Sequence, residues 1–223
     1  HRDRALLSVR AEAVLRRIAD LSDAAIEVVR SEAESRPRRW RLGVRHLVAT
    51  SGARERWQAA RLLEAIGTRE DVRVLRLAAK EMKGQSRQPD LGRSLARRIA
   101  DQVYVDDLGR LVIWIGKLEI AGTSIRRKAL ALLCFLLAQP RMSATRDQVL
   151  DALWPDLDPD QAANSLHQTV YFLRRVFEPE YVEDLSPGYV HHDPDVLWLD
   201  RELVTSRSHE YRSVAASIGA LAT

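Results

Sequence analysis

Hydrophobic positions follow two different patterns along the chain, and the change falls near residue 100. Before it, apolar residues such as Leu6, Ala13 and Leu21 recur at the spacing of one buried helix face. After Val103 the apolar runs shorten to a few β-branched and aromatic residues, separated by glycine turns. The pattern predicts a helical first part, followed by a part in which a small sheet is combined with helices.

Capping signals place several helix boundaries in the first part. Ser22 suits an N-cap, and Pro37 occupies a natural first-turn position. Gly67 suits the end of one helix, and Thr68, followed by acidic residues, suits the start of the next. The helices that meet there, within residues 40–82, resemble one HEAT-like helix pair, although no repeat extends over the full segment. A helical domain of this kind presents a surface to a partner; a helical spacer is an equal alternative.

A polar segment, KGQSRQPDLG at residues 83–92, interrupts the helical pattern. Its glycine and proline residues predict a linker. The sequence RSLARRIA after it predicts one more short helix, so that the helical domain is expected to span residues 1–100.

The second part begins with strands and continues with helices. VYVDD, RLVIWIG and KLEIAG predict a small antiparallel sheet, because each run is rich in β-formers and turn residues separate them. Helices are predicted at RRKALALLCFLLA, at TRDQVLDALWP and from Asp160 to Phe177. Thr145 and Gln148 have the spacing of a capping box. YVEDLSPGYVHHD and DVLWLD then predict a β-hairpin that turns at Ser186-Pro187-Gly188.

The helix from Asp160 to Phe177 has an unusual outer face. Its apolar residues, centred on Leu166, fall on one side of a helical wheel. The opposite side carries no Lys or Glu, but Asn164, Gln168, Tyr171 and Arg175. Asn and Gln can bond adenine, Arg can bond guanine, and Tyr can reach a phosphate. For Arg174 and Arg175, a solvated basic helix end is the alternative interpretation.

This order of elements resembles the OmpR-type winged-helix domain, in the version found in bacterial transcriptional activators of the SARP/BTAD class. The matching motifs are RRKALALLCFLL for the first helix, TRDQVLDALWPDLDPDQAANSLHQTVYFLRRVF for the second and third, and SPGYVHHD for the wing. The resemblance covers residues 110–200. It implies a sequence-specific regulator of transcription that inserts its third helix into the major groove of double-stranded DNA and contacts RNA polymerase.

The resemblance also implies which residues meet the DNA. On the third helix these are Asn164, His167, Gln168 and Tyr171, facing base edges or nearby phosphates, with Arg174 and Arg175 towards the backbone. The wing would reach the adjacent backbone or groove through Ser186, Gly188, Tyr189 and His191. Arg126, Arg127 and Lys128, at the start of the first helix, would contact phosphates; a solvated charge run is an equal alternative. Leu153 and Trp154 are expected in the core.

A second hypothesis is a protein-interaction scaffold whose winged helix is a docking module without DNA binding. Its first support is the acidic balance of residues 101–223, which hold 12 Lys and Arg against 18 Asp and Glu. Residues 1–100, in contrast, hold 23 Lys and Arg against 13 Asp and Glu. The wing sequence EDLSP also carries two acids and no cation. A third hypothesis is that the basic helical half supplies nonspecific affinity for nucleic acid.

Composition limits the other classes. Hydrophobic residues make up 46% of the chain and charged residues 30%, which indicates a globular protein. No apolar run approaches the roughly 20 residues of a membrane span. Cys134 is the single cysteine; it is expected to be a buried thiol, and a cytoplasmic location fits. No phosphate-binding glycine loop or nucleophile motif occurs, and a polar turn is favoured over a metal cluster for HHDPD at residues 191–195.

The predicted fold class is mainly α with a small β component. Residues 1–100 are predicted to form an α-helical, HEAT-like domain, and residues 101–200 an OmpR-type winged helix-turn-helix with an N-terminal antiparallel sheet and a hairpin wing. Residues 201–223 are predicted to form a C-terminal helical tail, as the start of a further domain, and the chain is expected to be a fragment at both ends. The helical domain is expected to bind a protein or ligand or to mediate a homodimer. We expect no catalytic activity, no cofactor and no metal.

Overall fold

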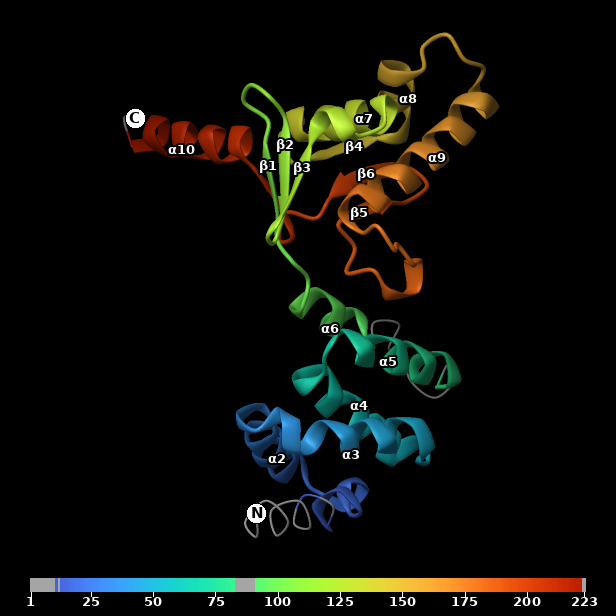
Figure 1. Ribbon diagram of the computed structural model, residues 1–223, viewed down its shortest axis with the longest axis vertical. Helices are drawn as coiled ribbons and strands as arrows, with labels where there is room; N and C mark the ends of the chain where they lie inside the picture. The colour runs from blue at the N-terminus through green and yellow to red at the C-terminus, as the bar shows by residue number, and fades with distance from the viewer. Residues whose placement is uncertain (1–10, 12, 83–90, 222–223) are drawn as a thin grey trace. The chain divides into compact units, whose positions relative to one another are not determined.

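The computed structural model describes residues 11, 13–82 and 91–221, and the chain separates into two compact units (Figure 1). The first unit comprises His1–Ile99 and Glu183–Pro187, and the second comprises Ala100–Val182 and Gly188–Thr223. The fold is mainly helical with a small sheet component, which confirms the predicted fold class. The predicted domain ranges and the HEAT-like character of the first stay predictions.

Amphipathic helices build the first unit. Its elements are η1 (Ile18–Asp20), α2 (Asp23–Ser35), α3 (Pro37–Thr50), α4 (Ala53–Ile66), α5 (Arg69–Glu81), α6 (Arg93–Arg98) and the short turn η3 (Glu183–Leu185). Leu63, Leu75 and Leu95 are fully buried in its core. The Ser22 side chain accepts a hydrogen bond from the Ala25 N–H, and Pro37 begins α3, so both predicted boundaries are confirmed. Residues 83–90 of the predicted linker lie outside the described residues.

The junction of α4 and α5 needs a glycine for space. Gly67 has φ −70°, an extended conformation and not the left-handed one common at helix ends. A Cβ atom at this position would lie 2.5 Å from the Leu63 carbonyl oxygen and 2.7 Å from the Leu95 side chain. Thr68 then begins α5 in a capping box with Asp71, whose carboxylate accepts the Thr68 N–H at 2.8 Å.

Two sheets belong to the second unit. Their strands are β1 (Val103–Asp106), β2 (Val112–Ile115), β3 (Leu118–Ala121), β4 (Ser143–Thr145), β5 (Val190–His192), β6 (Val196–Leu199) and β7 (Val204–Ser206). The strand orders are β3-β2-β1-β7 and β4-β6-β5. Antiparallel pairing of β1, β2 and β3 confirms the small sheet predicted from the sequence. The strand β7 joins β1 in parallel, so part of the predicted helical tail lies in this sheet.

Three helices of the second unit pack around one core, and the last one contributes none of its described residues to it. The helices are α7 (Arg127–Ala138), α8 (Arg146–Leu153), α9 (Pro159–Phe177) and α10 (Arg207–Leu221), with the 3-10 turn η2 (Gly122–Ser124). Leu132, Leu136 and Leu166 are fully buried where α7 and α9 pack. Thr145 and Gln148 form the predicted capping box of α8. Trp154 is buried and Leu153 packs against the core, as expected.

The hairpin turns at a different place from the predicted one. Its strands β5 and β6 are joined by Asp193, Pro194 and Asp195, and the Asp193 N–H donates to the Val196 carbonyl oxygen at 3.0 Å. Proline is pre-set for the first corner of such a turn. The predicted turn at residues 186–188 instead follows η3. Since Pro187 has no N–H to donate and Gly188 has φ +89°, a strand ladder forms only after them.

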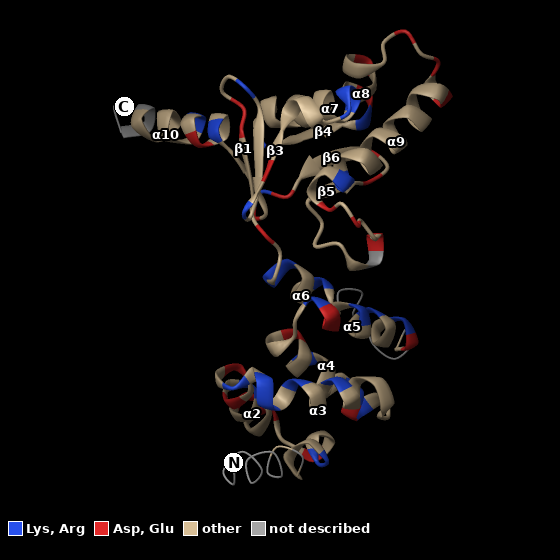
Figure 2. Cartoon of the chain, viewed as in Figure 1, with Lys and Arg blue, Asp and Glu red and all other residues tan. Residues whose placement is uncertain are grey.

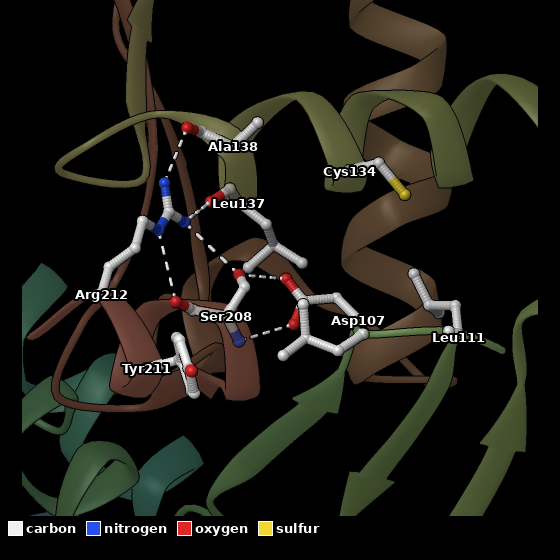
Figure 3. Close-up of a pocket in the computed structure, with 10 residues that line it drawn as sticks. Asp107, Leu111, Cys134, Leu137, Ala138, Ser208, Tyr211 and Arg212 are labelled. Carbon is white, nitrogen blue, oxygen red and sulfur yellow. Dashed lines mark hydrogen bonds between the residues drawn. The ribbon is translucent and has the colours of Figure 1, made fainter. Parts of the chain in front are cut away.

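The first turns of α10 hold it to β1 and α7 (Figure 3). Asp107 accepts hydrogen bonds from the Ser208 N–H and hydroxyl group, and Arg212 donates to the last carbonyl oxygens of α7. These side chains line a groove of about 530 Å³ together with Cys134. The thiol is exposed there, so the expectation of a buried cysteine was wrong. It lies on the outward side of α7, because the inward side is taken by leucines.

Candidate nucleic-acid interface

The helix α9 presents an exposed stripe of polar side chains. Its first turn is capped by Asp158, whose carboxylate accepts the N–H groups of Asp160 and Gln161 at 3.1 Å each. One face is buried in the core, and the opposite face exposes Asn164, Gln168, Tyr171 and Arg175. No Lys, Arg, Asp or Glu occurs between Asp160 and Arg174, so the middle of α9 is uncoloured in Figure 2. A helix face exposed to water alone usually carries such charges.

An arginine stacked on an aromatic ring borders one side of this stripe. The Arg126 guanidinium carbon lies 3.6 Å from the centre of the Phe172 ring. Arg126 is the N-cap of α7, and Arg127 and Lys128 form its exposed first turn. Cations at a helix N-terminus are disfavoured by the helix dipole. Their accumulation here therefore fits an anionic partner better than it fits the stability of α7.

Lys128 is the most constrained of these three cations. Its ammonium group donates to the carbonyl oxygen of Leu153, at the end of α8, and lies 5.2 Å from the centre of the Trp154 ring. The amine therefore joins α7 to α8. Of the three predicted phosphate contacts, Arg126 is the one that the structure brings beside the exposed stripe of α9.

Two histidines lie on the other side of the stripe. The rings of His167, on α9, and His192, on β5, are 4.9 Å apart, centre to centre. Burial lowers the pKa of His192, and the positive charges of His167, Arg174 and Arg146 act in the same direction. The Arg174 Nε–H donates to the Val190 carbonyl oxygen at 3.1 Å and so joins α9 to β5.

The histidine of β5 that lies beside α9 is His192, whereas the sequence predicted a DNA contact at His191. In a strand, alternate side chains share one face. Val190 is buried in the core, which puts His192 on the same side of the strand and His191 on the other. His191 stacks on Trp198, with ring centres 4.6 Å apart, and its Nε2 atom lies 3.4 Å from the Asp200 carboxylate. The alternation from Val190 was the signal that could have identified His192.

The remaining wing residues are not brought to the exposed stripe of α9. Tyr189 is only 4% exposed, and its hydroxyl donates to the Asp101 carbonyl oxygen at 2.7 Å. This burial favours a packing role for Tyr189, and its predicted DNA contact stays a prediction. Ser186 belongs to the first unit, and Gly188 supplies the backbone conformation before β5.

Replacing Tyr189 by phenylalanine is expected to affect stability and not DNA affinity. The variant removes the hydroxyl that bonds to Asp101 but keeps the ring, which packs 5.8 Å from Phe177. Loss of one such bond lowers the free energy of unfolding by about 1 kcal/mol. Thermal unfolding measures this change, and a binding titration on duplex DNA should give an unchanged dissociation constant. A weaker affinity without loss of stability would support Tyr189 as a DNA contact.

Acidic residues restrict where a polyanion can approach. Asp156, Asp158 and Asp160 are exposed before and at the start of α9, where Figure 2 is red. Asp193 and Asp195 are exposed at the hairpin turn. Like charges repel phosphate at both places, so DNA is expected to approach the middle and the C-terminal half of α9 most closely. In that half the Arg175 Nε–H donates to the Pro179 carbonyl oxygen at 3.1 Å, and the guanidinium lies 6.0 Å from the Tyr171 ring.

Within the ranges that the structure describes, no three His, Cys, Asp or Glu side chains gather as metal ligands would. The helices of those ranges include none that combines the length and the apolarity needed to cross a bilayer.

Comparison with known proteins gives a match for one part of the chain. No curated protein and no solved structure matches the sequence. Residues 121–189 match the family described as transcriptional regulatory protein, C terminal. The matched segment runs from the end of β3 to the residue before β5, and therefore contains α7, α8 and α9. The match is to a family of OmpR-type winged-helix domains, and it supports a DNA-binding role in the regulation of transcription.

Proposed function

We propose that the protein binds double-stranded DNA sequence-specifically, with α9 in the major groove, and thereby regulates transcription. The observation that carries the proposal is the polar stripe of α9, which holds no charged side chain between Asp160 and Arg174, with Arg126 on one side and His167 on the other. The major groove is about 12 Å wide and bordered by two phosphate backbones. An α-helix with its side chains is about 10–12 Å across. The stripe would face the base edges, while Arg126 on one side and His167 on the other would face the two backbones.

Each exposed side chain of α9 has a role in this arrangement. Asn164 and Gln168 are one helical turn apart and can each make a pair of hydrogen bonds to an adenine. Arg175 can do the same with a guanine, and Tyr171, between them, can reach a phosphate or stack. Arg174 joins α9 to β5 and Lys128 joins α7 to α8, each by donating to a carbonyl oxygen. Arg127 would contact a phosphate. The hairpin would meet the backbone through His192, the last residue of β5, and not through the turn that follows, because that turn is acidic.

The resemblance to SARP/BTAD-class activators extends the proposal. A bound regulator of that class acts in the bacterial cytoplasm and contacts RNA polymerase. The helical unit would then bind a protein or a ligand, or pair two copies on neighbouring half-sites. Pairing would offset the net negative charge of residues 101–223, which weakens the binding of a single copy.

The alternative function is a docking module for another protein, without DNA binding. The observation that favours it is the exposed acid at the start of α9 and at the hairpin turn, because both places would repel a phosphate backbone. A docking module would not bind duplex DNA at any salt concentration. The two functions therefore differ in one measurement.

That measurement is fluorescence anisotropy of a labelled random-sequence duplex pool across a salt series. Affinity is expected to fall as salt rises, because bound cations release counterions from the phosphates. Arg126→Ala should weaken binding to all sequences alike and reduce the log–log salt slope by about 1. The matched control is Arg201→Ala, which removes an exposed arginine from the turn after β6 and should change neither quantity. Absence of binding by the wild-type chain at low salt would contradict the proposed function.

A further inference from the structure

Four basic side chains from three elements converge beside α9. His167 and Arg174 lie on α9 itself, His192 on β5, and Arg146 at the start of α8. The two imidazole rings are in contact, at 4.9 Å between centres. The backbone N–H of Arg146 donates to the Asp195 carbonyl oxygen at 2.8 Å, which fixes the hairpin turn against α8. The cluster is thus held in place by backbone hydrogen bonds at α8 and at β5.

The charges around His192 leave this cluster in need of an anion. Burial, His167, Arg174 and Arg146 all disfavour a proton on His192, in that order. Among the groups that act on it, Asp193 alone favours the proton, and its effect is the smallest. Positive groups that outnumber the carboxylates acting on them repel one another. A bound anion removes that repulsion, which makes the cluster a better anion site than a stabilising feature of the fold.

The position of the cluster indicates which anion it takes. His167 lies on α9 next to the exposed stripe that we propose to read bases, on the side that faces a backbone. A DNA phosphate diester carries one negative charge and accepts hydrogen bonds, which suits imidazolium and guanidinium donors. His192 is only partly buried, so its ring has access to the surface.

We propose that His167, His192 and Arg146 together bind one backbone phosphate of DNA, and that His192 takes up a proton from solvent as the phosphate docks. The inference rests on the proposed function. No covalent bond forms or breaks: the proton adds to an imidazole nitrogen, and the resulting N–H donates to a phosphate oxygen. The bound phosphate raises the pKa of His192 above its value in the free protein. The gain in affinity is therefore full at acidic pH and is lost as the pH rises through the pKa of the complex.

The test is the pH dependence of DNA affinity, measured by anisotropy on the random-sequence duplex pool at constant salt. The wild type is expected to bind about tenfold more tightly near pH 5.5 than near pH 7.5, since ordinary histidine titrates near 6.5. His192→Gln should lose most of this difference. His192→Lys keeps a permanent charge, so it should bind at both pH values as the wild type does at the acidic one. The matched control is His46→Gln, an exposed histidine of α3, which should leave the pH dependence unchanged.

A second measurement requires no variant. Calorimetric titration of the wild type with the same duplex pool, in two buffers that differ in ionisation enthalpy, reports the protons taken up on binding. Between about half a proton and one proton per bound chain is expected near pH 6.5. No uptake, or a wild-type pH dependence that persists in folded His192→Gln, would overturn the phosphate site and leave the proposed function intact. Failure of the wild type to bind DNA at any pH would overturn both.

Discussion

Replacing Asn164 and Gln168 together by alanine is expected to lower the affinity for a preferred DNA site about a hundredfold. Each side chain that pairs with a base edge contributes about 1–3 kcal/mol of discrimination. Both residues are exposed on α9 and uncharged. Their loss should therefore weaken specific binding while leaving the salt dependence and the affinity for random DNA nearly unchanged. Alanine also has the higher helix propensity, so α9 itself is not weakened.

The measurement needs a preferred site, which rounds of selection from the random-sequence pool supply. The double variant and the wild type are then titrated with the selected duplex and with the unselected pool. Gln102→Ala is the matched control, since Gln102 is exposed just before β1 and lies far along the chain from α9. Equal losses on both DNAs would assign Asn164 and Gln168 to the backbone. No loss on the selected duplex would contradict the placement of α9 in the major groove.

The features that could be predicted from the sequence depend on near neighbours in the chain. Ser22 and Thr145 cap their helices because the N–H groups that they satisfy are three residues away. The two faces of α9 follow from helical spacing alone, and the antiparallel sheet follows from short β-rich runs with turns between them. For the same reason the exposure of Asn164 and Gln168 was predictable without a structure.

The features that were missed depend on partners far away in the sequence. Cys134 sits in an apolar run, but only the packing of α7 on α9 decides which side of the run faces water. The strand β7 was missed because its pairing partner, β1, lies about a hundred residues earlier. The role proposed for His192 depends on His167 and Arg146, which lie on two other elements. Contacts between segments that are far apart in the chain produce no pattern in the spacing of neighbouring residues, so the sequence does not reveal them.

Asp71 is the clearest example of a residue whose role depends on partners far away in the sequence. From its neighbours in the chain it is only an acid in the first turn of a helix. Its side chain is 0% exposed. One carboxylate oxygen lies 3.0 Å from the Arg41 Nε atom, and the other accepts a hydrogen bond from the Arg45 Nε–H. This hydrogen bond also raises the pKa of Arg45. A buried carboxylate therefore joins α5 to α3, through partners 26 and more residues away.

Asp71→Asn is expected to lower the free energy of unfolding of the helical unit by about 3–5 kcal/mol, the range for removing one partner of a buried ion pair. The amide keeps the shape of the side chain, but its charge no longer balances two arginines that have left most of their water. The lower end of that range is the better expectation, because Arg41 and Arg45 stay 26% and 28% exposed and can recover some hydration.

Glu70→Gln is the matched control for this prediction. Glu70 bonds to the same two arginines, but its side chain is 73% exposed. An exposed pair contributes about 0–1 kcal/mol, so the control should barely change the unfolding transition. Scanning calorimetry of the whole chain separates the cases, since the change should fall on the transition of the helical unit and not on that of the unit with α9. Equal effects of the two substitutions would show that burial of Asp71 does not govern the pairing of α3 with α5.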